Sequence, residues 1–350
     1  MRFTALLIAN RGEVAIRIAR AAADLGLRTV AVHSADDAAS LHTRVADESH
    51  ILPGSGAQSY LNADAIIATA IATGCDAIHP GYGFLAERGD FARRCAERGI
   101  TFVGPDVEHL ELFGDKSRAR AAATAADVPV LKGVDHAVSL EAAREFFESL
   151  GPNAGMMIKA VAGGGGRGTR VVANPDELEL TFARCQSEAK AAFGLPEVYV
   201  EEFVSRARHI EVQIAGDQSS IVHLGERECS IQRRHQKIIE IAPAPNLDDD
   251  LRTRIIQAAV RFATKENYTN LGTFEFLVDE SQGENRQPFV FIEANARLQV
   301  EHTVTEEVTG VDLVCVQIQL AGGASLAELG LDGPGLYQPR GYAIQARVNM

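Results

Sequence analysis

The stretch KAVAGGGGRG, residues 159–168, lies between two apolar runs that each have the length of a strand. Glycines leave backbone N–H groups free to surround a polyphosphate, and the flanking Lys159 and Arg167 add positive charge. A Walker A loop is excluded because no GKS or GKT follows the glycines. A flexible linker has a similar composition, but linkers seldom separate two strands and carry a cation at each end. The stretch therefore predicts a glycine-rich phosphate loop that acts as a lid.

Upstream of this loop, short apolar runs alternate with helical patterns. Residues 5–9 (ALLIA) and 28–33 (RTVAVH) predict strands, and residues 13–25 between them have helical spacing. This order predicts a parallel α/β unit. The first turn holds one glycine, Gly12, so the dinucleotide-binding fingerprint is absent. We expect residues 1–112 to form a Rossmann-like domain that does not bind NAD.

Downstream of residue 112 the pattern changes to longer strands with fewer helices. Residues 113–203 predict a linker and lid region, and residues 204–350 predict a mixed α+β central region. The fold class expected for the whole chain is α/β. The chain stops inside a predicted strand, GYAIQARV (341–348), so we expect a fragment whose last domain is incomplete.

The bulk composition limits the classes of function. A formal net charge of −13 argues against a nucleic-acid partner, which would require a basic face. The five cysteines are far apart and form no C-x-x-C pair, which is typical of reduced thiols and makes a zinc site improbable. No apolar run approaches the roughly 18 residues of a membrane span. We expect a cytoplasmic protein with neither nucleic acid nor membrane as a partner.

Two strands joined by a polar connection predict a metal site. In GTFEFLVD, Glu275 lies between two phenylalanines and so faces the opposite side of the strand. In FVFIEAN, Glu293 and Asn295 are two residues apart and share a face. If the strands form a hairpin, the three side chains converge, and such oxygen ligands suit magnesium or manganese bound to nucleotide phosphates. A solvated sheet face is the alternative, but the aromatic neighbours favour a buried hairpin.

Several charged residues outside this hairpin remain ambiguous by themselves. Arg297 and Glu301 could bind an oxyanion and remove a proton, or could form a salt-bridged loop. The basic segment QRRHQK (232–237) could be an anion pocket or a solvated turn. By default, His209 is a structural histidine within a strand and Lys116 is a surface lysine at a helix start.

A set of ordered motifs resembles the biotin carboxylase family over essentially the whole chain. They are NRGEVAIR (10–17), HPGYGFLAE (79–87), GGGGRG (163–168), ERECSIQRRHQK (226–237), GTFEF (272–276) and EANARLQVEHTVTEE (293–307). The resemblance implies an ATP-grasp fold with a Rossmann-like N-terminal domain, a glycine-loop lid and a central domain that carries metal and bicarbonate. It also implies the ligands ATP, magnesium or manganese, bicarbonate and carrier-bound biotin.

The resemblance also assigns roles to individual residues. ATP would be contacted by Lys116, Lys159, Gly165, Gly166, Glu201, Glu202, Phe203, Val204, His209, Gln232, His235 and Glu275. The metal ligands would be Glu275, Glu293 and Asn295. Bicarbonate would be held by Lys237, Arg297 and Val300, and Glu301 would be the base that deprotonates it. Arg347 would stabilise the biotin enolate.

The implied reaction is the first half-reaction of a biotin-dependent carboxylase, an ATP-dependent ligase. The leading expectation is the biotin carboxylase component of an acyl-CoA carboxylase, with the same domain of a pyruvate carboxylase as the alternative. The implied partners are a biotin carboxyl carrier domain and a carboxyltransferase component, and the full-length protein would be a homo-oligomer. Other possibilities are a different ATP-grasp ligase, such as a carbamoyl-phosphate synthase, or a nucleotide-binding module without catalysis.

Overall fold

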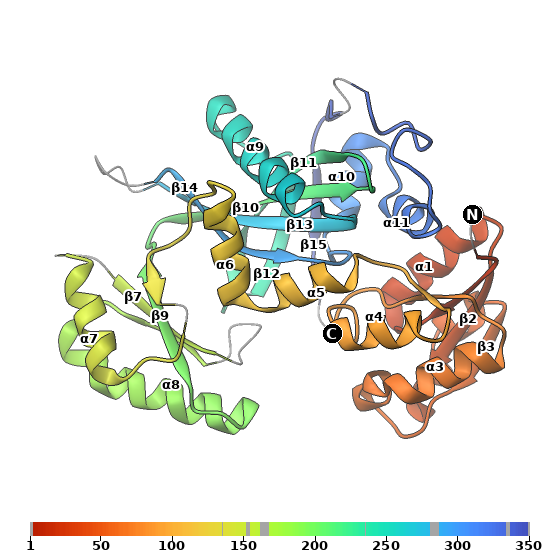
Figure 1. Ribbon diagram of the computed structural model, residues 1–350, viewed down its shortest axis with the longest axis horizontal. Coiled ribbons are helices and arrows are strands. Elements are labelled where there is room, and N and C mark those ends of the chain that lie inside the picture. The colour runs from red at the N-terminus through yellow and green to blue at the C-terminus, as the bar shows by residue number, and fades with distance from the viewer. Residues whose placement is uncertain are drawn as a thin grey trace.

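The computed structural model describes residues 3–134, 136–151, 155–161, 168–234, 236–280, 287–333 and 337–348. Within these residues the strands form three sheets, which we call the N-terminal, lid and central sheets. Figure 1 shows the lid sheet and the N-terminal sheet on either side of the central sheet. The predicted α/β class is therefore confirmed.

The N-terminal sheet is parallel throughout, with strand order β3-β2-β1-β4-β5. Its strands are β1 (Ala5–Ile8), β2 (Arg28–His33), β3 (Glu48–Ile51), β4 (Ala77–His79) and β5 (Thr101–Phe102). The helices that alternate with them are α1 (Gly12–Asp24), α2 (His42–Val45), α3 (Ala63–Ala72) and α4 (Gly89–Ala96). This order confirms the predicted Rossmann-like start.

Strand β1 and helix α1 show why this unit forms. Every residue of β1 is buried, as expected for a strand covered by helices on both faces. Helix α1 buries Val14, Ile18 and Ala22, which recur at helical spacing. Gly12, the first residue of α1, has a φ of +65°, a conformation that L side chains rarely adopt. The single glycine of the first turn therefore meets a backbone requirement of the strand-to-helix connection.

The lid sheet is antiparallel, with strand order β6-β9-β7-β8. Its strands are β6 (Gly133–Val134), β7 (Gly155–Ala160), β8 (Thr169–Val172) and β9 (Val198–Phe203). Helices α7 (Leu140–Ser149) and α8 (Leu178–Phe193) pack against it around a core that includes Met156, Ile158 and Val200. All residues of this core come from the lid region itself, so the lid is a separately packed unit.

The central sheet is antiparallel, with strand order β14-β13-β10-β11-β12-β15. Its strands are β10 (Ala207–Gly216), β11 (Ile221–Arg233), β12 (Gln236–Ala242), β13 (Asn270–Asp279), β14 (Phe289–Asn295) and β15 (Ala343–Ala346). The helices nearest to it are α5 (Val107–Gly114), α6 (Lys116–Ala125), α9 (Asp249–Lys265), α10 (His302–Thr309) and α11 (Leu313–Ala321).

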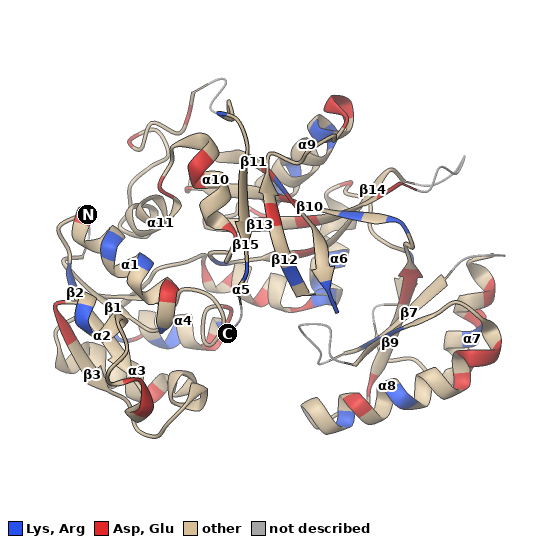
Figure 2. Ribbon diagram, turned by 180° about the vertical axis from the view of Figure 1, so that it is seen from behind, with Lys and Arg blue, Asp and Glu red and all other residues tan. Residues whose placement is uncertain are grey.

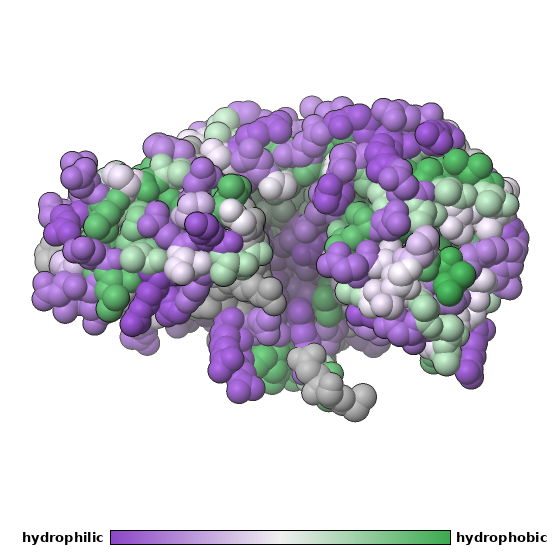
Figure 3. Space-filling model, turned by 90° about the horizontal axis from the view of Figure 1, so that it is seen from below, coloured by the Kyte–Doolittle hydropathy of each residue, from purple (hydrophilic) through white to green (hydrophobic). Residues whose placement is uncertain are grey.

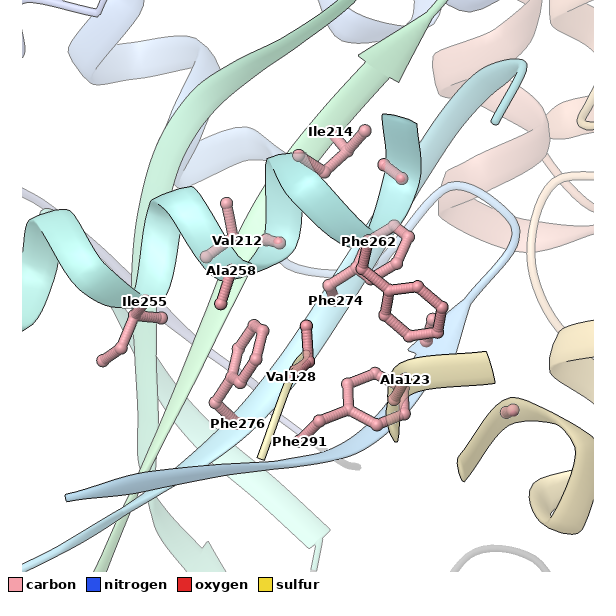
Figure 4. Close-up of a cluster of buried hydrophobic side chains, with 14 of the residues drawn as sticks. Ala123, Val128, Val212, Ile214, Ile255, Ala258, Phe262, Phe274, Phe276 and Phe291 are labelled. Carbon is pink, nitrogen blue, oxygen red and sulfur yellow. The ribbon is translucent and has the colours of Figure 1, made fainter. Parts of the chain in front are cut away.

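An aromatic core covers one face of the central sheet. Phe262 of α9 makes edge-on ring contacts with Phe274 of β13 and Phe291 of β14, at centroid distances of 5.4 and 5.2 Å (Figure 4). Phe276 packs edge-on against Phe291 in the same core. Because side chains alternate along a strand, Glu275 must point to the opposite face of the sheet. The apolar core therefore fixes the side on which polar groups gather.

Two details of the structure are not evident from the sequence. Strand β11 extends to Arg233 and β12 begins at Gln236, so Gln232 and Lys237 of the basic segment are cross-strand partners in this hairpin. Helix α11 begins at Leu313, because the side chain of Asp312 caps it by accepting a hydrogen bond from the Cys315 amide. The proposed divisions at residues 112 and 203 stay predictions. Among the described helices, none is both long and apolar enough to cross a bilayer.

Candidate active site

A cavity of about 360 Å³ lies between the lid sheet and the central sheet. Figure 3 shows the surface hollowed between two lobes, with hydrophilic residues inside the hollow. The cavity brings together many of the residues expected to contact ATP or metal, although they are far apart in sequence. Those that line it are Lys116, Lys159, Glu201, Glu202, Phe203, Val204, His209, Gln232, Glu275 and Glu293.

The lid sheet provides one wall of this cavity. Lys159 on β7 forms an ion pair with Glu201 on the adjacent strand β9. Lys116 is the first residue of α6, a position fixed by Asp115, whose side chain caps the helix. Gly165 and Gly166 of the expected phosphate loop lie outside the described residues, as does His235. Lys159 of the lid sheet and Lys116 of α6, beside the central sheet, thus both line the same cavity.

Glu275 of β13 is the most heavily bonded carboxylate on the central wall. Its Oε1 accepts hydrogen bonds from Lys237 at 3.0 Å, Asn295 at 2.7 Å and Gln299 at 2.9 Å. Its Oε2 lies 2.6 Å from Nε2 of His209. Burial would raise the pKa of Glu275, but Lys237 and His209 hold it far below its ordinary value. Glu275 therefore remains a carboxylate in a site that is almost closed to solvent.

His209 and Gln232 belong to the same network. Gln232 donates to Nδ1 of His209 at 3.0 Å and to the carbonyl oxygen of Cys229 at 2.8 Å. With Nδ1 accepting, the imidazole proton is on Nε2, from which it is donated to Glu275. Both residues line the cavity, as the resemblance predicted for ATP contacts.

Lys237 of β12 lies at the centre of the charged groups. Its ammonium nitrogen contacts carboxylate oxygens of Glu211, Glu275 and Glu301 at 2.6, 3.0 and 2.7 Å. Burial lowers the pKa of Lys237, but these three carboxylates more than offset it and raise the pKa well above its ordinary value. The ammonium group is therefore a permanent positive charge among three negative ones. Figure 2 shows residues of both signs along this sheet.

Glu301 and Arg347 meet on the far side of Lys237. Glu301 is fully buried, and its second oxygen accepts a hydrogen bond from Arg347 at 2.9 Å. Arg347 follows β15 and also pairs with the buried Glu240. Burial lowers the pKa of Arg347, while Glu301 and Glu240 raise it, with a net increase. The expected base and the expected biotin-binding arginine are thus in direct contact.

Arg297 lies in the connection between β14 and α10, together with Val300. It donates to Oδ1 of Asn295 at 2.8 Å and to Oε1 of Gln299 at 2.9 Å. It also forms an ion pair with Glu87 of the N-terminal domain, 3.0 Å away. The guanidinium is therefore held beside the metal-ligand candidates and is less than one-fifth exposed. Both Arg297 and Val300 are partly accessible, as a substrate contact requires.

The β13–β14 hairpin has the register that a metal site needs. Glu275 and Glu293 are direct cross-strand partners, and the Asn295 amide donates to Glu275. The two carboxylates line the cavity that Lys116 and Lys159 also face. Carboxylate and amide oxygens beside two lysines that are expected to contact phosphates fit magnesium or manganese. His209, Glu211 and Glu275 also lie close enough to one another to hold an ion.

Sequence reasoning missed Glu211, Arg227, Gln299 and Glu87. Glu211 is the cross-strand partner of both Glu275 and Arg227, and all of its side chain is buried. The sequence does contain a pattern that indicates Glu211, because Glu211 lies between the apolar residues Ile210 and Val212 as Glu275 lies between two phenylalanines. Gln299 and Glu87 have no comparable local signal, because tertiary contacts alone bring them to Glu275 and Arg297.

Comparison with known families agrees with this geometry. The model of the biotin carboxylase N-terminal domain matches residues 2–110. The model of the carbamoyl-phosphate synthase L chain ATP binding domain matches residues 115–329. Together they cover both the Rossmann-like start and the cavity, and they define an ATP-grasp ligase.

Relatives of known structure narrow this class. A biotin carboxylase from Campylobacter jejuni, in complex with β,γ-ATP, is 42% identical, with a TM-score of 0.91 over 99% of this chain and 75% of that one. The biotin carboxylase domain of the Hydrogenobacter thermophilus 2-oxoglutarate carboxylase, in complex with MgADP, ADP and bicarbonate, is 41% identical with a TM-score of 0.92 and the same coverage. This chain belongs to the biotin carboxylase family.

Curated relatives with higher identity are longer proteins. Pyruvate carboxylase of Staphylococcus aureus is 51% identical over 98% of this chain and 30% of its own length. Human mitochondrial pyruvate carboxylase is 51% identical over 98% of this chain and 29% of its length. The chain thus spans about 30% of the length of these relatives.

Proposed function

We propose that this chain uses ATP and bicarbonate to carboxylate biotin, as the biotin carboxylase part of a larger carboxylase. The observation that carries the proposal is the contact of Lys237 with Glu275 and Glu301 at 3.0 and 2.7 Å. This contact brings together three groups in one site: Glu275, an expected metal ligand, Glu301, the expected base, and Lys237, a cation that can bind an anionic substrate.

ATP binds in the cavity between the lid and central sheets. Its phosphates are held by Lys116 and Lys159, and its adenine lies along the 201–204 connector, which lines the same cavity. Glu275, Glu293 and Asn295 would hold magnesium or manganese. When bound, the ion neutralises triphosphate charge and polarises the transferred phosphoryl group.

Bicarbonate binds beside the γ-phosphate, held by Arg297, Lys237 and Val300. A guanidinium can bind two oxygens of one anion through parallel hydrogen bonds. Glu301 removes the remaining proton, and a bicarbonate oxygen attacks the γ-phosphorus. The bond from phosphorus to the bridging oxygen of ADP breaks, which yields carboxyphosphate and ADP. Closure of the lid would keep water from this labile intermediate.

Biotin is carboxylated in the second step. Carboxyphosphate splits into carbon dioxide and phosphate beside biotin. The phosphate takes the proton of the biotin N1′, and N1′ then bonds to the carbon dioxide. Arg347 stabilises the negative charge that develops on the ureido oxygen. Its contact with Glu301 at 2.9 Å supports a biotin site adjacent to the bicarbonate site.

The comparisons also bear on which molecule finally accepts the carboxyl group and on which partners take part. The 51% identity with pyruvate carboxylases supports pyruvate at least as well as the acyl-CoA acceptor that was the leading expectation. A single-chain long-chain acyl-CoA carboxylase of known structure is 45% identical over 98% of this chain and 31% of its own length, with a TM-score of 0.82. We expect a biotin carrier domain, a carboxyltransferase component, a homo-oligomer and a cytoplasmic location.

Release of ADP tests the proposed reaction. The purified protein is incubated with MgATP, with and without bicarbonate and free biotin, and ADP is measured over time. Release should require bicarbonate and should increase when biotin is added. Tight MgATP binding without bicarbonate-dependent release of ADP would instead indicate a nucleotide-binding module without catalysis.

A further inference from the structure

Arg227 of β11 lies directly behind the candidate active site and has no expected substrate contact. Its side chain is 0% exposed. It pairs through Nε with Oε1 of Glu211. Its Nη1 donates to Gln213 at 2.9 Å and to Thr305 at 2.8 Å, and its Nη2 donates to Thr273 at 3.1 Å. These acceptors belong to β10, β13 and α10, so one guanidinium joins four elements of the central region.

A fully buried ion pair is an expensive way to join elements. Removing two charges from water costs about as much as their attraction returns, and apolar residues of similar volume often stabilise a fold equally well. The guanidinium does offer a rigid fork of donors that fixes the angle as well as the distance of each acceptor. The chemistry of Arg227 therefore suits control of position more than added stability.

Glu211 transmits that control to Lys237. Its Oε1 accepts from Arg227, and its Oε2 accepts from Lys237 at 2.6 Å. Burial would raise the pKa of Glu211, but Lys237 and Arg227 lower it to about 2, so it stays ionised. Of the three carboxylates around Lys237, Glu275 has an expected metal role and Glu301 has an expected proton-transfer role. Glu211 is the one with no expected substrate, metal or proton-transfer role, and its two oxygens bind Arg227 and Lys237.

Thr305 provides a second connection, toward Glu301. Thr305 is on the first turns of α10 and is almost fully buried. Glu301 is the N-cap residue of the same helix. The hydrogen bond from Arg227 to Thr305 therefore sets the position of α10 relative to β11, and with it the position of the expected base.

We propose that Arg227 is a positioning residue for bicarbonate activation, which holds Lys237 through Glu211 and Glu301 through Thr305 at their working separation. This inference rests on the proposed function and extends it to two residues, Arg227 and Glu211, that touch no substrate. If Arg227 only stabilised the fold, its substitution would lower the melting temperature and would weaken the binding of ATP and of bicarbonate alike. A positioning residue affects bicarbonate use while the nucleotide cavity, lined by other residues, keeps its affinity.

The test compares Arg227→Met and Arg227→Lys with Arg252→Lys. Arg252 is a matched control, because it donates to Glu226, the neighbour of Arg227 on β11, at 2.9 Å and lies outside the site. The measurements are kcat/KM for bicarbonate in ADP release, the Kd of MgATP and the melting temperature.

Arg227→Met should lose about a hundredfold in kcat/KM for bicarbonate, with the Kd of MgATP within about twofold of the parent. Arg227→Lys keeps the charge facing Glu211 but cannot reach all the other acceptors, so it should recover part of the loss. Arg252→Lys should remain within about twofold in kcat/KM. A folded Arg227→Met protein with unchanged kcat/KM for bicarbonate would overturn the inference, as would an equal loss of MgATP affinity.

Thr305→Val decides the question if neither Arg227 variant folds, because it keeps Arg227 and removes only the hydroxyl acceptor. It should lose about threefold to tenfold in kcat/KM for bicarbonate, and an unchanged value would again overturn the inference. Failure of the parent protein to release ADP with bicarbonate would contradict the proposed function itself. The two failures are therefore distinguishable.

Discussion

The two walls of the ATP cavity are built in different ways. On the central wall, Lys237, Glu211, Glu275 and Glu301 hold one another through contacts of 2.6 to 3.0 Å. On the lid wall, the described ion pair at the cavity joins Lys159 and Glu201. The central sheet also shares hydrophobic clusters with neighbouring elements, whereas the lid has a core of its own residues.

This difference indicates that the two walls have different functions. Groups that fix one another before substrate arrives lower the reorganisation needed during reaction, which is what proton and phosphoryl transfer require. A separately packed lid can move as a body without disturbing that arrangement. We therefore expect substitutions on the central wall to affect turnover, and substitutions on the lid wall to affect nucleotide affinity.

The largest effect should come from Glu301. Glu301→Gln keeps the size of the side chain but removes its ability to take a proton. Bicarbonate-dependent turnover should fall by about 10²–10⁴-fold, the range typical of a general base, while MgATP affinity stays near normal. Glu307→Gln is the control, because Glu307 is exposed on the same helix. Unchanged turnover of Glu301→Gln would show that Glu301 is not the base.

Glu293 should have the next largest effect. Glu293→Gln removes a charged cross-strand partner of Glu275, so a metal bound there would lose one carboxylate. ATP cleavage should fall by about a hundredfold, and the half-saturating Mn²⁺ concentration should rise. Metal binding is measured directly by titration calorimetry, and Glu280→Gln, at an exposed position directly after β13, serves as the control. An unchanged metal affinity would show that the hairpin is not the metal site.

Acid should destabilise the central region through His302 of α10. Burial lowers the pKa of His302 to about 4, whereas the unfolded residue titrates near 6.5. As pH falls below about 6.5 the unfolded state binds the proton first, so stability present above that pH is lost until about pH 4. At pH 5 the loss from His302 is about 2 kcal/mol, or roughly thirtyfold in the unfolding equilibrium.

Urea unfolding at pH 7.5 and pH 5 measures this loss. His302→Gln should show a smaller decrease between the two pH values than the parent protein. Equal decreases in both proteins would mean that His302 is not responsible for the acid sensitivity.

Lys159 on the lid wall should have the smallest effect on chemistry. Lys159→Gln removes a cation expected at the phosphates, so the Kd of MgATP should rise by about tenfold while kcat changes little. Arg170→Gln on the neighbouring strand β8, where Arg170 pairs with the exposed Glu188, is the control. A large loss of kcat in Lys159→Gln with an unchanged Kd of MgATP would contradict the expectation that the lid wall mainly determines nucleotide affinity.

Local patterns predicted most of the fold and part of the site. Alternation along β13 placed Glu275 opposite its phenylalanine neighbours, and the hairpin then brought Glu293 and Asn295 to it. The same alternation around Glu211 was overlooked, because one carboxylate within a strand has no visible partner in the sequence. The threefold pairing of Lys237 depends on the register of β10, β12 and β13 and on the packing of α10, which the sequence alone does not reveal. Helix α10 was also missed, since its first residues resemble a polar loop.

The central claim is that bicarbonate, and not water, attacks the γ-phosphate at the central wall. Incubation with MgATP and ¹⁸O-labelled bicarbonate, in the presence of biotin, tests it by mass analysis of the phosphate released. If carboxyphosphate forms and splits as proposed, each phosphate should carry one labelled oxygen from bicarbonate. Phosphate that acquires its new oxygen from unlabelled water would contradict the account.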